Sequence, residues 1–277
     1  MIRTVKALYT WLIWVFFLLV LASLLFPISW WLVFFPLILA IVTPSPRADR
    51  QPPRTIRPPV IGRWITGNSP ANKVPSHGVR TLGQAFAIDI LQSPNSPERT
   101  SPGWALRQAP PEDYACFGQP VLASSSGTVV AKLDKMHDHR ARNTWPGLIF
   151  MMSIEAFVRG LASPRFTLGN HVIIDHGDGA FSLYAHLKHG SVSITTGQQV
   201  QAGDFLGQVG NTGNSSEPHL HFQLMDRANP TMAAGLPFRW AHITTDPEPD
   251  PYWTPKKPAL EQVAGLPATG QVFHCPG

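Results

Sequence analysis

The stretch Glu217-Pro218-His219-Leu220-His221-Phe222 places two histidines two positions apart. The apolar residues between and after the histidines predict a β-strand over residues 219–224. Successive side chains of a strand alternate between its two faces, so His219 and His221 are expected on the same face. Neutral imidazole is a common zinc ligand, and a neighbouring imidazole can exchange a proton near neutral pH. The pair indicates either a metal site or two ordinary strand histidines, and partners elsewhere in the chain must distinguish these readings.

Candidate partners for this pair lie upstream, at His77 and at Asp89. Asp89 is embedded in the apolar run 84–90, which predicts a strand. An ionised carboxylate in such surroundings costs several kcal/mol unless it is paired or bound to a cation, so Asp89 requires a metal or an arginine. The alternative is that Asp89 caps a turn at the end of the strand.

A third histidine, His186, belongs to a predicted β-hairpin. The apolar run 171–175 is followed by the glycine turn 177–179 and by a second strand over 181–187, which contains Tyr184-Ala185-His186-Leu187. His186 is therefore expected near the end of a strand.

These residues and the glycine-punctuated strands between them resemble the lysostaphin-type (LytM-like) zinc metallo-endopeptidases, which cut peptidoglycan peptides. The resemblance covers roughly residues 76–226. It rests on the order and spacing of the stretches 169–177, 184–187, 197–204, 207–215 and 218–222. The resemblance implies that His77, Asp89 and His221 bind one zinc ion per chain. It also implies that His186 and His219 are active-site residues that do not bind the metal.

The chain departs from the family pattern in the first motif, because His77 and Asp89 are separated by 12 positions (89 − 77). We interpret residues 79–84 as a loop inserted between the two ligands, and a longer loop adds little closure entropy. A rival cluster, His137, Asp138 and His139, lies in a basic polar stretch that predicts a solvated loop.

Three protein ligands leave a tetrahedral zinc ion one position for a water, whose pKa falls toward about 7. His219 is expected to take the proton of that water and to deliver it later to the leaving amine. His186 is expected to hydrogen-bond the water or to stabilise the oxyanion. Which of the two histidines is the general base stays open at this point.

The many short strands predict a mainly β protein with an antiparallel sheet or sandwich, inserted loops and one helix. The resemblance adds the LytM-like architecture with its duplicated hybrid motif. Within the 277 residues, we expect an N-terminal transmembrane anchor, a linker rich in Pro and Arg, the metallopeptidase domain and an irregular Pro-rich tail, over residues 1–43, 44–72, 73–232 and 233–277 respectively.

Two segments interrupt the strand pattern. Residues 91–114 are rich in Pro, Ser and charge and predict a surface loop. Apolar residues at partly helical spacing predict a helix over 145–159 that covers the cleft. This helix is either a packing insertion or a substrate-binding lid.

The N-terminal segment has no acidic or basic residue from Ala7 to Val42. Residues 8–26 are long enough to span a bilayer, and Pro27 separates them from a second apolar segment over 28–42. We expect either one long span or a hairpin of two helices. Basic residues flank the segment on both sides. Because peptidoglycan lies outside the cytoplasm, we expect the catalytic domain there, anchored to the cell membrane.

The remaining composition adds three expectations. Cys116 and Cys275 allow one disulfide or two unpaired buried thiols. The pI near 9.5 and the net charge of +5 favour an anionic envelope polymer. The basic residues are scattered without a nucleic-acid motif, so we expect no nucleic-acid partner.

Two other functions fit parts of the sequence. A catalytically silent protein of the same fold would bind cell wall or activate another hydrolase, but the five candidate site residues argue against it. A β-rich carrier module would need a modified lysine at a hairpin tip, and Lys188 is the only lysine between Lys135 and Lys256. One zinc ion per chain would favour the enzyme over both alternatives.

Overall fold

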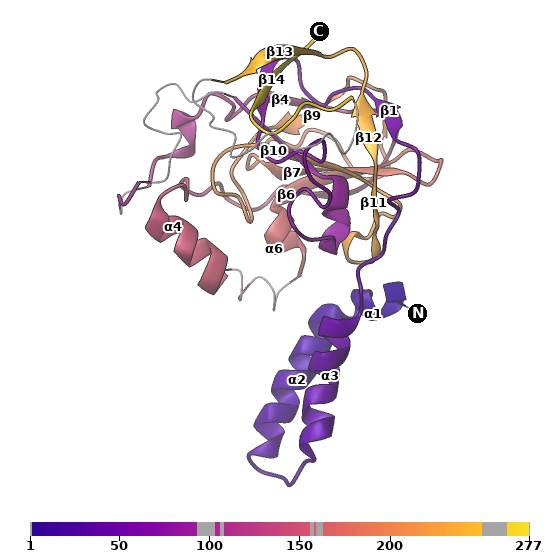
Figure 1. Cartoon of the computed structure of the whole chain (residues 1–277), viewed down its shortest axis with the longest axis vertical. Helices are drawn as coiled ribbons and strands as arrows, with labels where there is room; N and C mark the ends of the chain where they lie inside the picture. The colour runs from indigo at the N-terminus through magenta and orange to yellow at the C-terminus, as the bar shows by residue number, and fades with distance from the viewer. Residues whose placement is uncertain are drawn as a thin grey trace.

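The computed structural model describes residues 2–92, 103–105, 108–155, 158, 163–250 and 265–276. An antiparallel sheet of ten strands forms the centre of the fold (Figure 1). Nine of its strands follow one another in this order: β13 (Thr244–Pro249), β14 (Gln271–Cys275), β2 (Gly62–Thr66), β3 (Ile88–Leu91), β10 (Leu220–Met225), β7 (Phe181–Leu187), β6 (Asn170–Asp175), β5 (Gly127–Leu133) and β8 (Gln199–Val200). The tenth strand, β11 (Gly235–Leu236), pairs with β10. The expected mainly β, antiparallel fold is confirmed.

Two smaller sheets lie beside the large one. The antiparallel pair joins β4 (Pro120–Leu122) to β9 (Phe205–Gln208), and the parallel pair joins β1 (Arg54–Ile56) to β12 (Phe238–Trp240).

Strand β10 lies between β3 and β7 and carries His221, the second histidine of the pair. Leu220, Phe222 and Leu224 point into the main hydrophobic core, together with Tyr184 of β7. His221 alternates with these apolar residues and therefore projects from the opposite face of the strand. The hairpin formed by β6 and β7 is also present, with Ile173 opposite Leu183.

The chain on either side of the expected peptidase domain contributes strands. The segment 44–72, expected as a linker, contains β1 and β2, and Trp64 and Ile65 of β2 are buried. The segment 233–277, expected to be irregular, contains β11 to β14, and Phe273 is fully buried. Composition missed these strands because they are short and lie among proline and arginine residues.

The strand that carries Asp89 starts later than expected. Residues Thr81–Phe86 form the 3₁₀ helix η1, and β3 begins only at Ile88. Leu82 has a φ of 59°, in the left-handed region, so the inserted loop turns sharply before it enters the strand.

Short helices cover the sheet. The expected helix is present as α4 (Trp145–Phe150), which continues as the π-helical η4 (Met151–Glu155) and is capped by Thr144. Most of 156–159 lies outside the described residues, as does half of the predicted surface loop 91–114. The other short helices are η3 (Pro111–Asp113), α6 (Arg165–Leu168) and η5 (Pro230–Met232).

The N-terminal segment forms α1 (Ile2–Ala7) and a helical hairpin of α2 (Tyr9–Ser23) and α3 (Trp30–Val42), which protrudes from the domain in Figure 1. Of the two arrangements expected, the hairpin is therefore the one present. The transmembrane expectation is not supported, because no helix in the described ranges is long and apolar enough to cross a bilayer. The chain turns after Ser23, which leaves α2 at 15 residues, short of the roughly 20 that a span requires.

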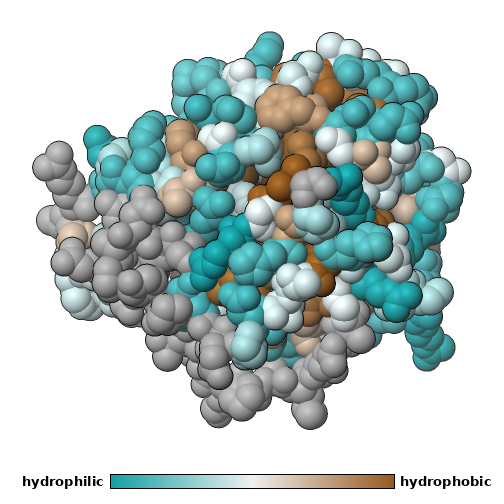
Figure 2. Space-filling model, turned by 90° about the horizontal axis from the view of Figure 1, so that it is seen from above, coloured by the Kyte–Doolittle hydropathy of each residue, from teal (hydrophilic) through white to brown (hydrophobic). Residues whose placement is uncertain are grey.

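Most of the exposed large apolar side chains belong to this hairpin, and Leu24 and Leu25 at its tip are 75% and 78% exposed. The opposite end of the molecule, viewed in Figure 2, is mostly hydrophilic with scattered apolar patches. The hairpin is fixed to the domain through α1, where the Arg3 guanidinium pairs with Asp226 and donates to the carbonyl oxygen of Met232.

Cys116 and Cys275 are free and buried, so the alternative of two unpaired thiols is the one present. Burial raises the pKa of both thiols to about 12. The Cys116 thiol donates a hydrogen bond to the carbonyl oxygen of Pro218, one residue before the histidine pair.

Candidate metal centre

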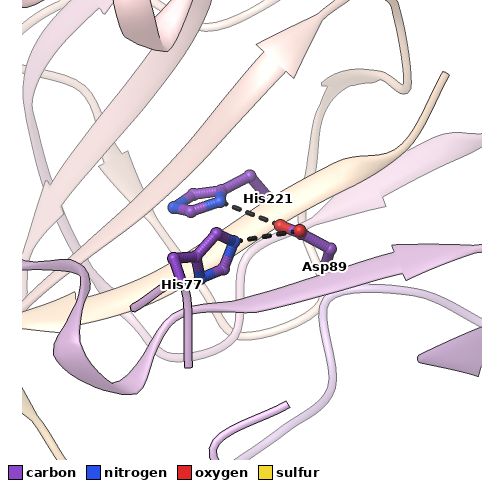
Figure 3. Close-up of side chains that lie close together, drawn as sticks. All are labelled: His77, Asp89 and His221. Atoms are coloured by element: carbon purple, nitrogen blue, oxygen red, sulfur yellow. Dashed lines mark hydrogen bonds and ion pairs between the residues drawn. The ribbon is translucent and has the colours of Figure 1, made fainter. Parts of the chain in front are cut away.

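Three side chains predicted as ligands meet at one point, shown in Figure 3. Strands β3 and β10 pair so that His221 lies directly opposite Asp89. One Asp89 oxygen lies 2.9 Å from His77 Nε2 and the other lies 2.9 Å from His221 Nδ1. The three candidate ligand atoms all lie within 4.8 Å of one another. The long spacing between His77 and Asp89 therefore does not keep these two residues apart.

Hydrogen bonds on the far side of each imidazole fix which ring nitrogen faces Asp89. Ser76 Oγ donates to the carbonyl oxygen of Ala87, so it accepts from His77 Nδ1–H, 2.9 Å away. With its proton on Nδ1, His77 directs the other ring nitrogen, Nε2, at the carboxylate of Asp89. Metal-binding histidines commonly have such a partner on the second ring nitrogen.

Gln223, on the same face of β10, fixes the ring of His221 so that the other type of ring nitrogen, Nδ1, faces Asp89. Gln223 Nε2 donates to the carbonyl oxygen of Leu82 at 2.7 Å, so its Oε1 faces His221 Nε2 at 2.9 Å and accepts a hydrogen bond from it. His221 Nδ1 is then the nitrogen directed at Asp89. The inserted loop between the first two candidate ligands thus supports the third.

Asp89 is the electrostatic centre of the cluster. Burial alone would raise the pKa of this carboxyl, but the electrostatic interactions with His77 and His219 and the close contacts with His221 and His77 hold the pKa well below its usual range. Burial would lower the pKa of His77, yet Asp89 raises it. Asn68 Nδ2 also donates to Asp89, at 2.7 Å. A buried carboxylate with two imidazole nitrogens directed at it is a set of donor atoms that fits zinc.

The two remaining predicted histidines lie beside this cluster with their rings 4.8 Å apart. His219 Nδ1–H donates to the carbonyl oxygen of Glu217 at 2.8 Å, and His186 Nδ1–H donates to that of Thr212 at 2.8 Å. Both rings therefore keep Nε2 unprotonated, and His219 Nε2 lies 3.6 Å from Asp89. Burial is the main cause that lowers the pKa of both histidines, so both are neutral and able to accept a proton at neutral pH.

A tight turn positions His186. The backbone of His186 has a φ of 62°, a strained conformation for a residue with a side chain. Thr212, whose carbonyl oxygen holds the ring, also donates from its hydroxyl to the carbonyl oxygen of Leu187. Next to Thr212, Gly213 has a φ of +74°, and a Cβ there would lie 2.4 Å from the backbone nitrogen of Gly169. The glycine allows the turn to pack against the start of β6.

All five predicted site residues are thus brought together, whereas the rival cluster is not part of the site. The Asp138 carboxylate accepts from the backbone N–H groups of Asn211 and His189, and His139 Nε2 lies 3.1 Å from the carbonyl oxygen of Gly213. These residues stabilise the loop behind the site. Lys188, considered as a carrier lysine, instead lies over the ring of Phe117.

The cluster opens into a cavity of about 190 Å³. Met151 of η4 forms part of its wall, so the helical insertion borders the candidate metal centre. An ion pair between Arg142 and Glu155, at 2.8 Å, holds the end of η4 against the domain. Packing insertion and lid both remain compatible with this placement.

Residues 153–232 match the sequence model of peptidase family M23. This chain contains a peptidase family M23 (LytM-like) domain. The match covers His186, His219 and His221, whereas His77 and Asp89 lie upstream of it. The geometry of the centre joins these two residues to the M23 domain.

Curated relatives of the M23 domain have names that describe two functions. The chain is 39% identical over 71 residues to the peptidoglycan DD-endopeptidase ShyA of Vibrio cholerae, a match that covers 25% of this chain and 16% of ShyA. It is 32% identical over 87 residues to the murein hydrolase activator EnvC of Escherichia coli, which covers 29% of this chain and 20% of EnvC. The chain therefore spans a quarter or less of the length of these relatives.

A solved structure similar to this chain is the catalytic domain of the antimicrobial peptidase lysostaphin from Staphylococcus simulans. The two chains are 20% identical, with a TM-score of 0.33 over 63% of this chain and 88% of lysostaphin's domain.

Proposed function

We propose that this protein is a zinc metallo-endopeptidase that hydrolyses peptide bonds in the stem or cross-bridge peptides of peptidoglycan. One observation carries the proposal: two histidine nitrogens and a buried carboxylate converge within 4.8 Å, beside two further histidines with an unprotonated Nε2. His77 Nε2, Asp89 and His221 Nδ1 would hold the zinc. When bound, zinc acts as a Lewis acid that activates a water and polarises the scissile carbonyl.

The remaining residues suit the proton transfers of such a hydrolysis. His219 is the better placed general base, because its Nε2 lies 3.6 Å from Asp89, next to the candidate ligands. Its Nδ1–H is fixed on the carbonyl oxygen of Glu217, so a proton taken up at Nε2 is available for the leaving amine. His186 is held by Thr212 from behind and presents its Nε2 to the same space, where it would orient the water or stabilise the oxyanion once protonated.

The alternative function is a silent M23 domain that activates other hydrolases, as the name of EnvC describes for that protein. The complete set of His77, Asp89, His221, His186 and His219 favours catalysis, because an activator has no need of these five side chains in a working arrangement.

We further propose that the helical hairpin attaches the protein to the cell membrane and that the peptidase domain lies outside the cytoplasm. The hairpin supports this attachment with exposed Leu24, Leu25 and Trp31 and with the uncharged run from Ala7 to Val42. The expected substrate supports the location outside the cytoplasm.

Hydrolysis of purified peptidoglycan by the zinc-loaded full chain tests the proposed reaction. We expect one zinc per chain and the release of new amino groups from the substrate. The Asp89→Ala variant should lose both, because its removal leaves the two ligand histidines without the central carboxylate. Asp246→Ala is the matched control. Asp246 also pairs with a histidine, His274 at 3.1 Å, but it lies at the edge of the sheet.

The outcomes of this experiment differ for each function. Stoichiometric zinc without any release of amino groups would favour the activator, and a fully metallated Asp89→Ala protein would refute the ligand assignment.

A further inference from the structure

A second cavity continues the one at the candidate metal centre. The cavity of about 190 Å³ at the centre and a neighbouring cavity of about 280 Å³ are both lined by Leu82, Gln84, Thr167 and Asn214. Because the two cavities share these walls, they are adjacent, and we take them together as one groove that runs from Asp89 along the inserted loop. An extended peptide bound at the metal centre would continue along such a groove.

The far wall of this groove is made by the N-terminal helices, well outside the part of the chain that matches the family. Lys6 of α1 and Tyr9 and Thr10 of α2 line it, opposite Arg80 and Thr81. The position of this wall is fixed by Arg3, whose guanidinium binds both Asp226 and the carbonyl oxygen of Met232. The helical segment is therefore joined to the domain at the groove itself.

The charged side chains that line the second cavity are all of one sign. Of the described residues that line the second cavity, Lys6 and Arg80 are cationic and none is acidic. Arg80 is neutralised by Asp49, 2.6 Å away. The Lys6 ammonium has no carboxylate partner among the described ion pairs; it lies 3.5 Å from the carbonyl oxygen of Ala40 and 5.6 Å from the centre of the Tyr9 ring. Lys6 therefore supplies a positive charge in the groove that no carboxylate of the described residues neutralises.

We propose that this groove binds the substrate peptide on one side of the scissile bond and that Lys6 pairs with a carboxylate of that peptide. This inference rests on the proposed peptidase function. It assigns the N-terminal helices to substrate recognition and makes the enzyme selective for a free carboxylate over its amide. An ammonium–carboxylate hydrogen bond in a partly buried groove contributes enough to change binding about tenfold.

The test compares two synthetic cross-linked peptides that differ only in whether the carboxylate next to the scissile bond is free or amidated. The zinc-loaded full chain should hydrolyse the free acid with a kcat/KM about tenfold higher, mainly through KM. Lys6→Gln should lose this preference, and Lys6→Arg should retain it because the charge is conserved. Lys132→Gln is the matched control, since Lys132 binds the carbonyl oxygen of Ile194 away from the groove.

Binding of the same peptides to the His219→Ala full chain, measured by calorimetry, gives a readout that is independent of turnover. A tenfold preference for the free acid that disappears in the double variant with Lys6→Gln supports the groove. Equal affinity for both peptides, or the same preference with and without Lys6, overturns it while leaving the peptidase proposal intact. Absence of hydrolysis by the zinc-loaded wild type overturns the peptidase proposal, and the binding experiment still tests the groove.

Discussion

At the scale of single residues, the site depends on His186 and His219 having the same protonation pattern. Each donates from Nδ1 to a backbone carbonyl and presents an unprotonated Nε2 to the cavity. Neither belongs to the group of candidate ligand atoms around Asp89. Metal binding and proton transfer are thus assigned to different histidines, and substitutions can separate the two functions.

His219→Ala should keep its zinc and lose hydrolysis by at least about a hundredfold, the usual loss when a general base is removed. Zinc content of the purified variant and the rate of amino-group release measure the two effects. Replacement of another histidine away from the site, His274→Ala, should change neither. Loss of zinc in the His219 variant would mean that this histidine is a metal ligand.

Glu217 should make stability depend on pH. Burial raises the pKa of this carboxyl from 4.5 to about 7 in the folded protein. Between these values the unfolded chain releases the proton before the folded protein does, so stability falls as pH rises from about 4.5 to about 7. The shift corresponds to a loss on the order of 3 kcal/mol.

Thermal unfolding from pH 5 to pH 8 tests this expectation. Glu217→Gln should be more stable than the wild type at pH 8 and should flatten the pH profile. Glu112→Gln, at an exposed position, serves as the control and should leave the profile unchanged. A wild-type profile that stays level between pH 5 and pH 8 would show that Glu217 ionises freely.

The resemblance to the lysostaphin-type family indicated the five central side chains, whose residue types metal chemistry restricts to histidine and carboxylate. It did not reveal Asn68 or Gln223, which hold Asp89 and His221 in place. An amide side chain has no residue-type signature for such a role, and its partners lie far away in sequence. Gln223 lies in the strand predicted over residues 219–224, on the same face as His221, which was the one available signal.

At the scale of elements, β10 and the inserted loop 79–84 act together through Gln223. Gln223→Met removes both of its hydrogen bonds at similar volume and should weaken zinc affinity by about tenfold to a hundredfold, as loss of a ligand's hydrogen-bond partner commonly does. Competition with a coloured chelator measures the affinity directly. Gln208→Met on β9 is the control for the same chemical change. Gln223→Glu keeps the acceptor for His221 and should recover part of the affinity.

The turn around Thr212 allows a comparison of two glycines with nearly the same φ. Gly213 has a φ of +74° and tight backbone neighbours, whereas Gly177 has a φ of +79° and open space around it. Gly177→Ala should cost about 1 kcal/mol of stability, through the backbone conformation alone. Gly213→Ala should cost several times more and also reduce hydrolysis, because it displaces the Thr212 carbonyl from His186. Equal effects in urea unfolding would contradict the proposed packing.

Elements with local signals were predictable and elements with distant partners were not. The β6–β7 hairpin and β10 have clear apolar patterns and turns, and all three are present. The strand β2 and its neighbour β14 were missed, although β2 pairs directly with β3, the strand that carries Asp89. Ile65 pairs with Val272, so the stability of both strands comes from contacts across the whole chain, which a local pattern does not contain.

At the scale of the whole molecule, the helical hairpin is an apolar projection from a mostly hydrophilic domain. Leu25→Asp places a charge at the tip of this projection, where the side chain is 78% exposed. We expect a several-fold loss of binding to phospholipid vesicles in a flotation assay. Ile61→Asp is the control, because Ile61 is an exposed apolar residue of the domain. Undiminished flotation of the Leu25 variant would exclude the hairpin tip as the membrane contact.

The same hairpin gives a test of sidedness. Protease added to intact spheroplasts should remove the peptidase domain and leave the hairpin in the membrane. Cleavage only after the membrane is permeabilised would place the domain inside the cell and replace the cell-wall substrate with an intracellular one.

The order of the strands also implies an order of assembly on the ribosome. Asp89 emerges early, but the candidate ligand His221 on β10 follows 132 residues later. The strand β14, which pairs with β2 two strands away from the strand of Asp89, is translated later still. Contacts this distant in sequence form slowly. We therefore expect a nascent chain to acquire zinc only after β10 and β14 have been translated, so that a polypeptide that stops before them has no hydrolytic activity.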